Sequence, residues 1–178
     1  MSSALPLIVV SSGEPAGIGP DIALALGSRA FSARLAVIGD PGLLATRARA
    51  LGAGISLSEC SNAAAVAPHR NGRLQVLPVP LRRPVRAGEL DTANAAYVLE
   101  MLRLGTELCV AGTAAAIVTA PVQKSVITNS GVKFSGHTEF LAELTGAPLP
   151  VMLLAGKSLR VALATTQDRK STRLNSSH

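Results

Sequence analysis

The chain has 178 residues, of which 48% are hydrophobic, 16% are charged and 2% are aromatic, with no Trp. This composition excludes a disordered chain, and the scarcity of aromatics implies a core of Ala, Leu, Val and Ile. The formal net charge is +6, but the basic residues are scattered and no aromatics are interleaved with them, so we expect no nucleic-acid partner.

The cysteines and the apolar runs indicate in which cellular compartment we expect the protein. Cys60 and Cys109 form no CxxC pair and no Cys/His spacing suited to zinc, which predicts two reduced thiols. Residues 1–5 carry no positive charge of the kind that begins a secretory signal. The longest apolar runs have the length of strands rather than of membrane spans. We therefore expect a cytoplasmic protein without a membrane segment.

Short apolar runs alternate with helical patterns along the chain. Helix-favouring features include Pro20 and Asp21 at the start of the first helix, and Asp91 and Thr92 as caps of the longest one. Strands are predicted at 5–10, 35–40, 55–59, 74–80, 115–120, 151–155 and 159–164, and helices at 21–30, 41–51, 91–109 and 139–144, with a loop and short helix at 121–129. This alternation predicts an α/β fold with a largely parallel sheet, and the Gly-Lys-Ser turn between the last two predicted strands indicates a hairpin.

The end of the sequence differs from the rest. From Gln167 it reads QDRKSTRLNSSH, which is polar and basic and has no apolar periodicity. The run KSTRLNSSH resembles translated sequencing-adapter sequence. We therefore expect residues 167–178 to be a non-native or disordered tail, and residues 1–166 to be the N-terminal portion of a larger protein.

A glycine-rich segment, GEPAGIGP at 13–20, lies between a predicted strand and a predicted helix. It fails the G-x-G-x-x-G test, because Ile22 stands where the last glycine belongs, and it contains no P-loop Gly-Lys-Ser/Thr. A close backbone approach to an anion and a purely structural tight turn explain it equally well. Glu14 is an unusual residue for such a turn.

Two further segments carry candidate ligand contacts. TAPVQK at 119–124 follows a strand, where Lys124 could meet a phosphate or carboxylate, although a solvated lysine is the simpler interpretation. SGHTE at 135–139 opens a helix, where His137 and Thr138 could donate to an anionic oxygen. The alternative is that Ser135 or Thr138 only caps this helix and His137 is incidental.

Taken together, GEPAGIGPD at 13–21, TAPVQK at 119–124 and FSGHTEFLAELTG at 134–146 resemble the 4-hydroxythreonine-4-phosphate dehydrogenase family of pyridoxal phosphate biosynthesis. The resemblance extends to the run PVPLRRPVRAGELDTANAAYVLEML and to LRVALATT at 159–166, and so covers residues 6–166. It implies a truncated, two-domain α/β fold similar to the isocitrate and isopropylmalate dehydrogenases, in which residues 1–166 include the start of the second domain. It also implies a homodimer in the full-length family.

The resemblance further implies an activity. The family uses NAD or NADP to oxidise 4-phosphohydroxy-L-threonine, a phosphorylated hydroxy acid, and the resulting β-keto acid loses carbon dioxide to give 3-amino-2-oxopropyl phosphate. His137 and Thr138 match the family's substrate-binding residues. Paralogues that act on erythronate or threonate 4-phosphate, and a non-catalytic phosphate-binding α/β module, remain alternatives.

The resemblance also implies a divalent metal, Zn, Mg or Co, which three histidines hold and which polarises the reacting oxygen. The family's first ligand histidine follows ATT, whereas this chain has Gln167 there. His69, His137 and His178 cannot form the family's metal site. We therefore expect no metal ligand in this chain, no activity from it alone, and most of the cofactor site to lie in residues that it lacks.

Overall fold

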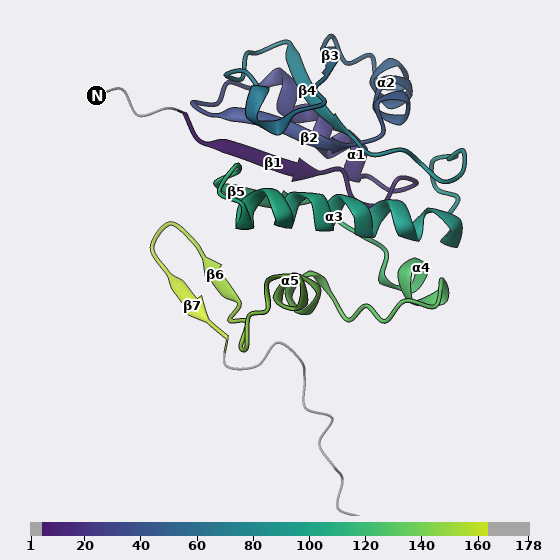
Figure 1. The fold of residues 1–178 in the computed structure, drawn as a ribbon. Helices are drawn as coiled ribbons and strands as arrows, with labels where there is room; N and C mark the ends of the chain where they lie inside the picture. Colours follow the sequence, from purple (N-terminus) through teal and green to yellow (C-terminus); the bar gives the residue numbers. More distant parts are fainter. Residues whose placement is uncertain (1–4, 164–178) are drawn as a thin grey trace, which may run out of the picture.

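A five-stranded parallel sheet forms the centre of the computed structural model, which describes residues 5–163 (Figure 1). Its strands run in the order β3-β4-β2-β1-β5, and all four pairings are parallel. The strands are β1 (Leu7–Ser11), β2 (Arg34–Gly39), β3 (Ser56–Glu59), β4 (Arg73–Pro78) and β5 (Ala116–Thr119). The predicted α/β class and parallel sheet are therefore confirmed.

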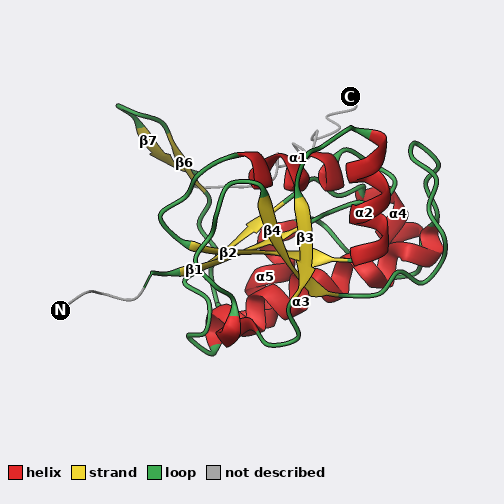
Figure 2. Cartoon of the chain, turned by 90° about the horizontal axis from the view of Figure 1, so that it is seen from above, coloured by secondary structure: helices red, strands yellow, loops and turns green. Residues whose placement is uncertain are grey.

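Helices cover both faces of this sheet (Figures 1 and 2). On one face, α1 (Gly19–Ala25) and α2 (Pro41–Ala50) pack on a core that includes Val10, Val37 and Val76. On the other face, α3 (Ala95–Val110) packs on Val9, Ile38 and Leu77. The chain reverses its direction of travel across the sheet at β1, because β2 lies on one side of β1 and β5 on the other. In open α/β sheets, ligands bind beyond the carboxyl ends of the strands at such a reversal.

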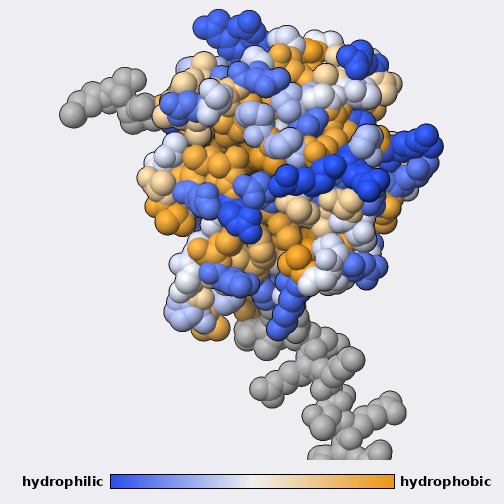
Figure 3. Space-filling model, turned by 45° about the vertical axis from the view of Figure 1, so that its right-hand side comes forward, coloured by the Kyte–Doolittle hydropathy of each residue, from blue (hydrophilic) through white to orange (hydrophobic). Residues whose placement is uncertain are grey.

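The remaining elements lie beyond α3. They are α4 (Lys124–Asn129), α5 (His137–Thr145) and an antiparallel hairpin of β6 (Leu153–Ala155) and β7 (Arg160–Ala162). The hairpin was predicted, and its pairing is confirmed. Leu153, Leu154 and Leu159 are exposed on it. Hydrophobic side chains also reach the surface elsewhere (Figure 3). Among residues 5–163, no helix is long and apolar enough to cross a membrane.

The aliphatic core contains one fully buried tyrosine. Tyr97 on α3 places its hydroxyl 2.9 Å from Ser12 Oγ, just beyond β1, and accepts from the backbone N–H of Asp40, just beyond β2. These bonds satisfy the phenol, which would otherwise be costly to bury. They also fix the carboxyl ends of the two strands relative to α3.

Several predicted boundaries shift in the structure. The helix predicted at 21–30 begins at Gly19 and ends at Ala25, and a 3-10 turn (Leu26–Ser28) follows. Gly27 favours helix poorly, and it lies so close to Ile55 that a Cβ there would be 3.0 Å from that side chain. Asp91 caps a 3-10 turn (Thr92–Asn94) by accepting from Ala93 N, and α3 follows directly. A third 3-10 turn spans Ala63–Ala65. Residues 167–178 lie outside the described residues.

Candidate functional site

The glycine-rich segment forms a tight turn from β1 into α1 at the carboxyl edge of the sheet. Gly13 has a φ of +73°, a conformation that favours glycine, and a Cβ there would clash with the carbonyl of Pro121. A Cβ at Gly19 would clash with the carbonyl of Ser12. Close approach of backbone to backbone within the protein thus explains both glycines. The structural interpretation of this segment is the better supported one.

Glu14 is buried within this turn, with 4% of its surface exposed. Its Oε1 accepts from Ala16 N at 3.3 Å, and its Oε2 has no hydrogen-bond partner among residues 5–163. Burial raises the pKa of this carboxyl, and the hydrogen bond from Ala16 opposes that shift in part. Glu14 is therefore held closer to its neutral form than an exposed glutamate is.

A partly buried ion pair fixes the outer side of the turn. Arg47 on α2 donates through Nε to Asp21 Oδ1 at 2.7 Å, and its Nη2 bonds both Asp21 Oδ2 and the carbonyl of Gly17 at 3.3 Å. The two side chains are 17% and 27% exposed. The fork of the guanidinium thus ties α2, the start of α1 and the turn into one unit.

The segment 119–124 adjoins the turn directly. The backbone N–H of Glu14 donates to Pro121 O at 2.9 Å, and Ala120 N donates to Ser11 O at 3.2 Å. Lys124 then begins α4, and its Nζ lies 3.4 Å from the position that a Cβ would take at Gly136. The three segments singled out in the sequence therefore form one continuous surface at the carboxyl edge of the sheet.

His137 and Thr138 are the first two residues of α5 and are half-buried. The His137 ring meets Phe134 edge-on, with centroids 6.1 Å apart, and its Nε2 is buried without a partner among the described residues. Burial lowers the pKa of His137, and the positive charge of Lys124 lowers it further. The imidazole is therefore neutral near pH 7, which leaves it able to donate one hydrogen bond and accept another.

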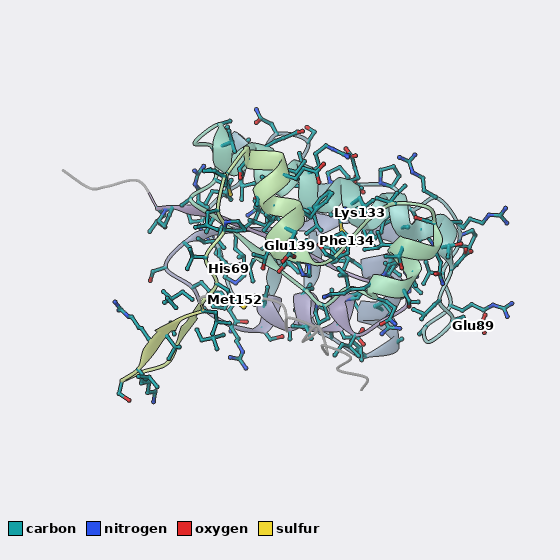
Figure 4. All side chains as sticks on the ribbon, turned by 90° about the horizontal axis from the view of Figure 1, so that it is seen from below. His69, Glu89, Lys133, Phe134, Glu139 and Met152 are labelled. Carbon is teal, nitrogen blue, oxygen red and sulfur yellow. The ribbon has the colours of Figure 1, made fainter. Side chains whose placement is uncertain are left out.

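The capping alternative for this segment is not met. The N-cap of α5 is Gly136, which makes no side-chain cap hydrogen bond. Ser135 and Thr138 are thus not explained as helix caps. Phe134 in the segment before α5 and Glu139 in its first turn lie near each other (Figure 4). The sequence interpretation missed Phe134 as a residue that positions His137, although it stands within the quoted FSGHTE run.

The described residues do not fit a metal centre. Residues 5–163 contain no group of three or more His, Cys, Asp or Glu side chains able to hold a metal ion. His69 lies in the loop before β4, where its Nε2 is 2.8 Å from Arg29 O. Gln167 lies outside the described residues. Because packing within the protein explains Gly13 and Gly19, these glycines give no independent indication of a dinucleotide site.

Comparison with known proteins gives consistent matches. Residues 32–168 match the family model of the pyridoxal phosphate biosynthetic protein PdxA. The chain is 52% identical over 161 residues to a 4-hydroxythreonine-4-phosphate dehydrogenase of Methylococcus capsulatus, covering 90% of this chain and 48% of that protein. It is 51% identical over 164 residues to one from Azoarcus, covering 92% and 49%. The chain thus spans about half the length of the curated relatives that it matches.

Solved structures agree with this assignment. A 4-hydroxythreonine-4-phosphate dehydrogenase from Burkholderia phymatum superposes with a TM-score of 0.81 at 29% identity, over 90% of this chain and 49% of that one. One from Klebsiella pneumoniae gives 0.80 at 31%, over 88% and 50%. A terephthalate 1,2-cis-dihydrodiol dehydrogenase from Burkholderia xenovorans shares the fold, with a TM-score of 0.69 at 22% identity. The resemblance found in the sequence is confirmed, and the chain belongs to the PdxA family of pyridoxal phosphate biosynthetic proteins.

Proposed function

We propose that the whole protein to which this chain corresponds is an NAD(P)- and divalent-metal-dependent 4-hydroxythreonine-4-phosphate dehydrogenase. It would oxidise 4-phosphohydroxy-L-threonine, and loss of carbon dioxide would yield 3-amino-2-oxopropyl phosphate for pyridoxal phosphate biosynthesis. The family match and the names of the relatives support this reaction. The relation to the isocitrate dehydrogenase fold, the cytoplasmic location and the homodimer are part of the same proposal.

The observation that carries the proposal is the approach of Lys124 to the start of α5. Its Nζ lies 3.4 Å from the Cβ position at Gly136, next to a neutral His137 with an unpartnered Nε2. An ammonium beside a neutral imidazole suits a substrate that carries both an anionic group and a hydroxyl. In this proposal His137 and Thr138 hydrogen-bond the substrate, and Lys124 attracts its phosphate or carboxylate.

The metal and the nicotinamide cofactor would be held by residues outside this chain. The relatives are about twice as long, and the family's first ligand position carries Gln167 here. An amide oxygen is a poorer ligand for a transition metal than imidazole nitrogen is. We therefore propose that the 178-residue chain has no dehydrogenase activity by itself.

A completed enzyme tests this proposal. Residues 1–166 would be joined to the second half of a curated relative, beginning with its histidine in place of Gln167. Rates of cofactor reduction would then be compared on 4-phosphohydroxythreonine, erythronate 4-phosphate and threonate 4-phosphate. The proposal predicts the highest kcat/KM on 4-phosphohydroxythreonine. A preference for either sugar acid phosphate would assign the site to a paralogous dehydrogenase, and phosphate binding without cofactor reduction would indicate a non-catalytic module.

A further inference from the structure

A polar cavity lies away from the candidate site, on the outer part of the sheet near the amino end of β4. Its volume is about 330 Å³. Arg73 begins β4 at this end, whereas the candidate site lies at the carboxyl edge of the sheet. The cavity is lined by Ser58, Ala67, Pro68, His69, Arg70, Arg73 and Gln75.

A rigid turn presents the two arginines of this cavity. Arg73 N donates to Arg70 O at 3.2 Å, and Gly72 occupies the third position of the turn with a φ of +81°. Such a turn holds the Cα atoms of its first and last residues within about 7 Å of each other. Gly72 N donates to Gly27 O at 2.8 Å, and Gly72 O accepts from Ser56 N at 2.8 Å. The turn is therefore fixed by bonds on both of its sides.

The floor and wall of the cavity are fixed as well. The side-chain amide of Gln75 both donates to and accepts from the backbone of Ala67, each at 2.9 Å. His69 donates its backbone N–H to Ala33 O at 2.9 Å, and its ring bonds Arg29 O. The backbone bonds that shape this cavity thus make no use of the guanidinium groups of Arg70 and Arg73.

The positive charge of the cavity is not compensated. Neither Arg70 nor Arg73 forms an ion pair with a carboxylate of residues 5–163. No Asp or Glu occurs between residues 60 and 88, a stretch that contains five arginines. Two arginines that line one cavity without a carboxylate partner favour a tetrahedral dianion, which can accept several of their N–H groups at once.

We propose that this cavity binds the phosphate group of a small molecule through Arg70 and Arg73, with the Ser58 hydroxyl as an additional donor. The site is separate from the one that contains His137, and the proposal does not rest on the dehydrogenase function. The bound species is either free phosphate or a phosphomonoester, and both present the same dianion to the arginines.

Backbone NMR of the whole chain tests the site. Inorganic phosphate and glycerol 3-phosphate would be titrated separately at low ionic strength, and the amide signals of residues 69–73 followed. The proposal predicts saturable shifts concentrated at Asn71, Gly72 and Arg73. Tighter binding of glycerol 3-phosphate identifies a phosphomonoester site, whereas equal or tighter binding of inorganic phosphate identifies a site for the free anion. The absence of saturable shifts with both probes overturns the proposal.

Two double variants with the same change of charge separate a built site from general attraction to a basic protein. Arg70→Gln/Arg73→Gln should weaken binding by about tenfold for each guanidinium removed. The control is Arg82→Gln/Arg83→Gln. These two residues lie beyond the other end of β4, where their backbone N–H groups donate to Asn94 Oδ1 at 3.0 Å, and the change should leave the affinity for phosphate within about twofold. An equal loss in both variants contradicts the proposal. Thermal melting of each variant verifies that the fold is retained.

Discussion

The backbone N–H of Glu14 lies 2.9 Å from the carbonyl of Pro121, and this hydrogen bond joins two segments more than a hundred residues apart in the sequence. It closes the carboxyl edge of the sheet where β1 and β5 are neighbours. From Pro121 the chain reaches Lys124, whose ammonium lies against Gly136 at the entry to α5. One backbone bond thus links the glycine-rich turn to the surface that we assign to the substrate.

Close backbone packing at the turn predicts a large effect of Gly19→Ala. In an ordinary helix this change is favourable, but here the new Cβ would clash with the carbonyl of Ser12, so we expect a loss of about 2–4 kcal/mol in the free energy of unfolding. Gly54→Ala is the matched control, because nothing lies within 4 Å of its Cβ position, and it should change stability by less than about 0.5 kcal/mol. Denaturant unfolding measures both. Equal effects of the two substitutions would show that the turn can relax.

Burial of Glu14 predicts a dependence of stability on pH. Because burial raises the pKa of Glu14 in the folded chain, the folded chain holds a proton that the unfolded chain releases. The stability linked to this proton is therefore present at low pH, and it is lost as pH rises above 4.5 and through the folded pKa. Glu14→Gln removes the charge and keeps an acceptor for Ala16 N. We expect it to stabilise the chain by about 1 kcal/mol at neutral pH and to have little effect below about pH 4. Glu89→Gln, at an exposed position, is the control with the same change of charge. A uniform loss at all pH values would contradict this explanation.

The charge of Lys124 predicts a shift in the titration of His137. The pKa of His137 is lowered by burial and by Lys124, so Lys124→Met should raise it while leaving it below the ordinary value of 6.5. Stability linked to this group is fully present above pH 6.5 and is lost as pH falls through the lowered pKa. NMR of the imidazole Hε1 measures the titration. Lys133→Met is the control, and an equal shift in both variants would mean that Lys124 has no specific effect.

The Arg47–Asp21 pair should contribute more than an exposed ion pair. A double-mutant cycle of Arg47→Gln and Asp21→Asn should give a coupling energy of about 1 kcal/mol, because the pair is bidentate and largely shielded from water. The Arg103–Glu100 pair, with both side chains 44% exposed, provides the comparison and should couple by less than about 0.5 kcal/mol. If the two cycles give equal values, the bidentate geometry and the shielding from water add nothing to the Arg47–Asp21 pair.

The local sequence pattern was sufficient to predict the strands and the hairpin. Their signals are contained in a few residues, such as the branched apolar runs at 35–40 and 74–80 and the turn after 155. The pattern did not predict where α1 ends, because Gly27 packs against Ile55 and a 3-10 turn takes the place of the last helical turn. Periodicity could not reveal the burial of Tyr97, because its partners stand on two different strand ends. The meeting of Lys124 with Gly136 likewise depends on the path of the chain around α4.

The most direct test of the account concerns His137 in the completed enzyme described above. His137→Asn should lower kcat/KM on 4-phosphohydroxythreonine by about a hundredfold or more, because the buried imidazole would no longer hydrogen-bond the substrate. His69→Asn, which alters a histidine away from that site, should leave kcat/KM within about twofold. If the two variants retain the same activity as the unsubstituted enzyme, the surface around Lys124 and His137 is not the substrate site.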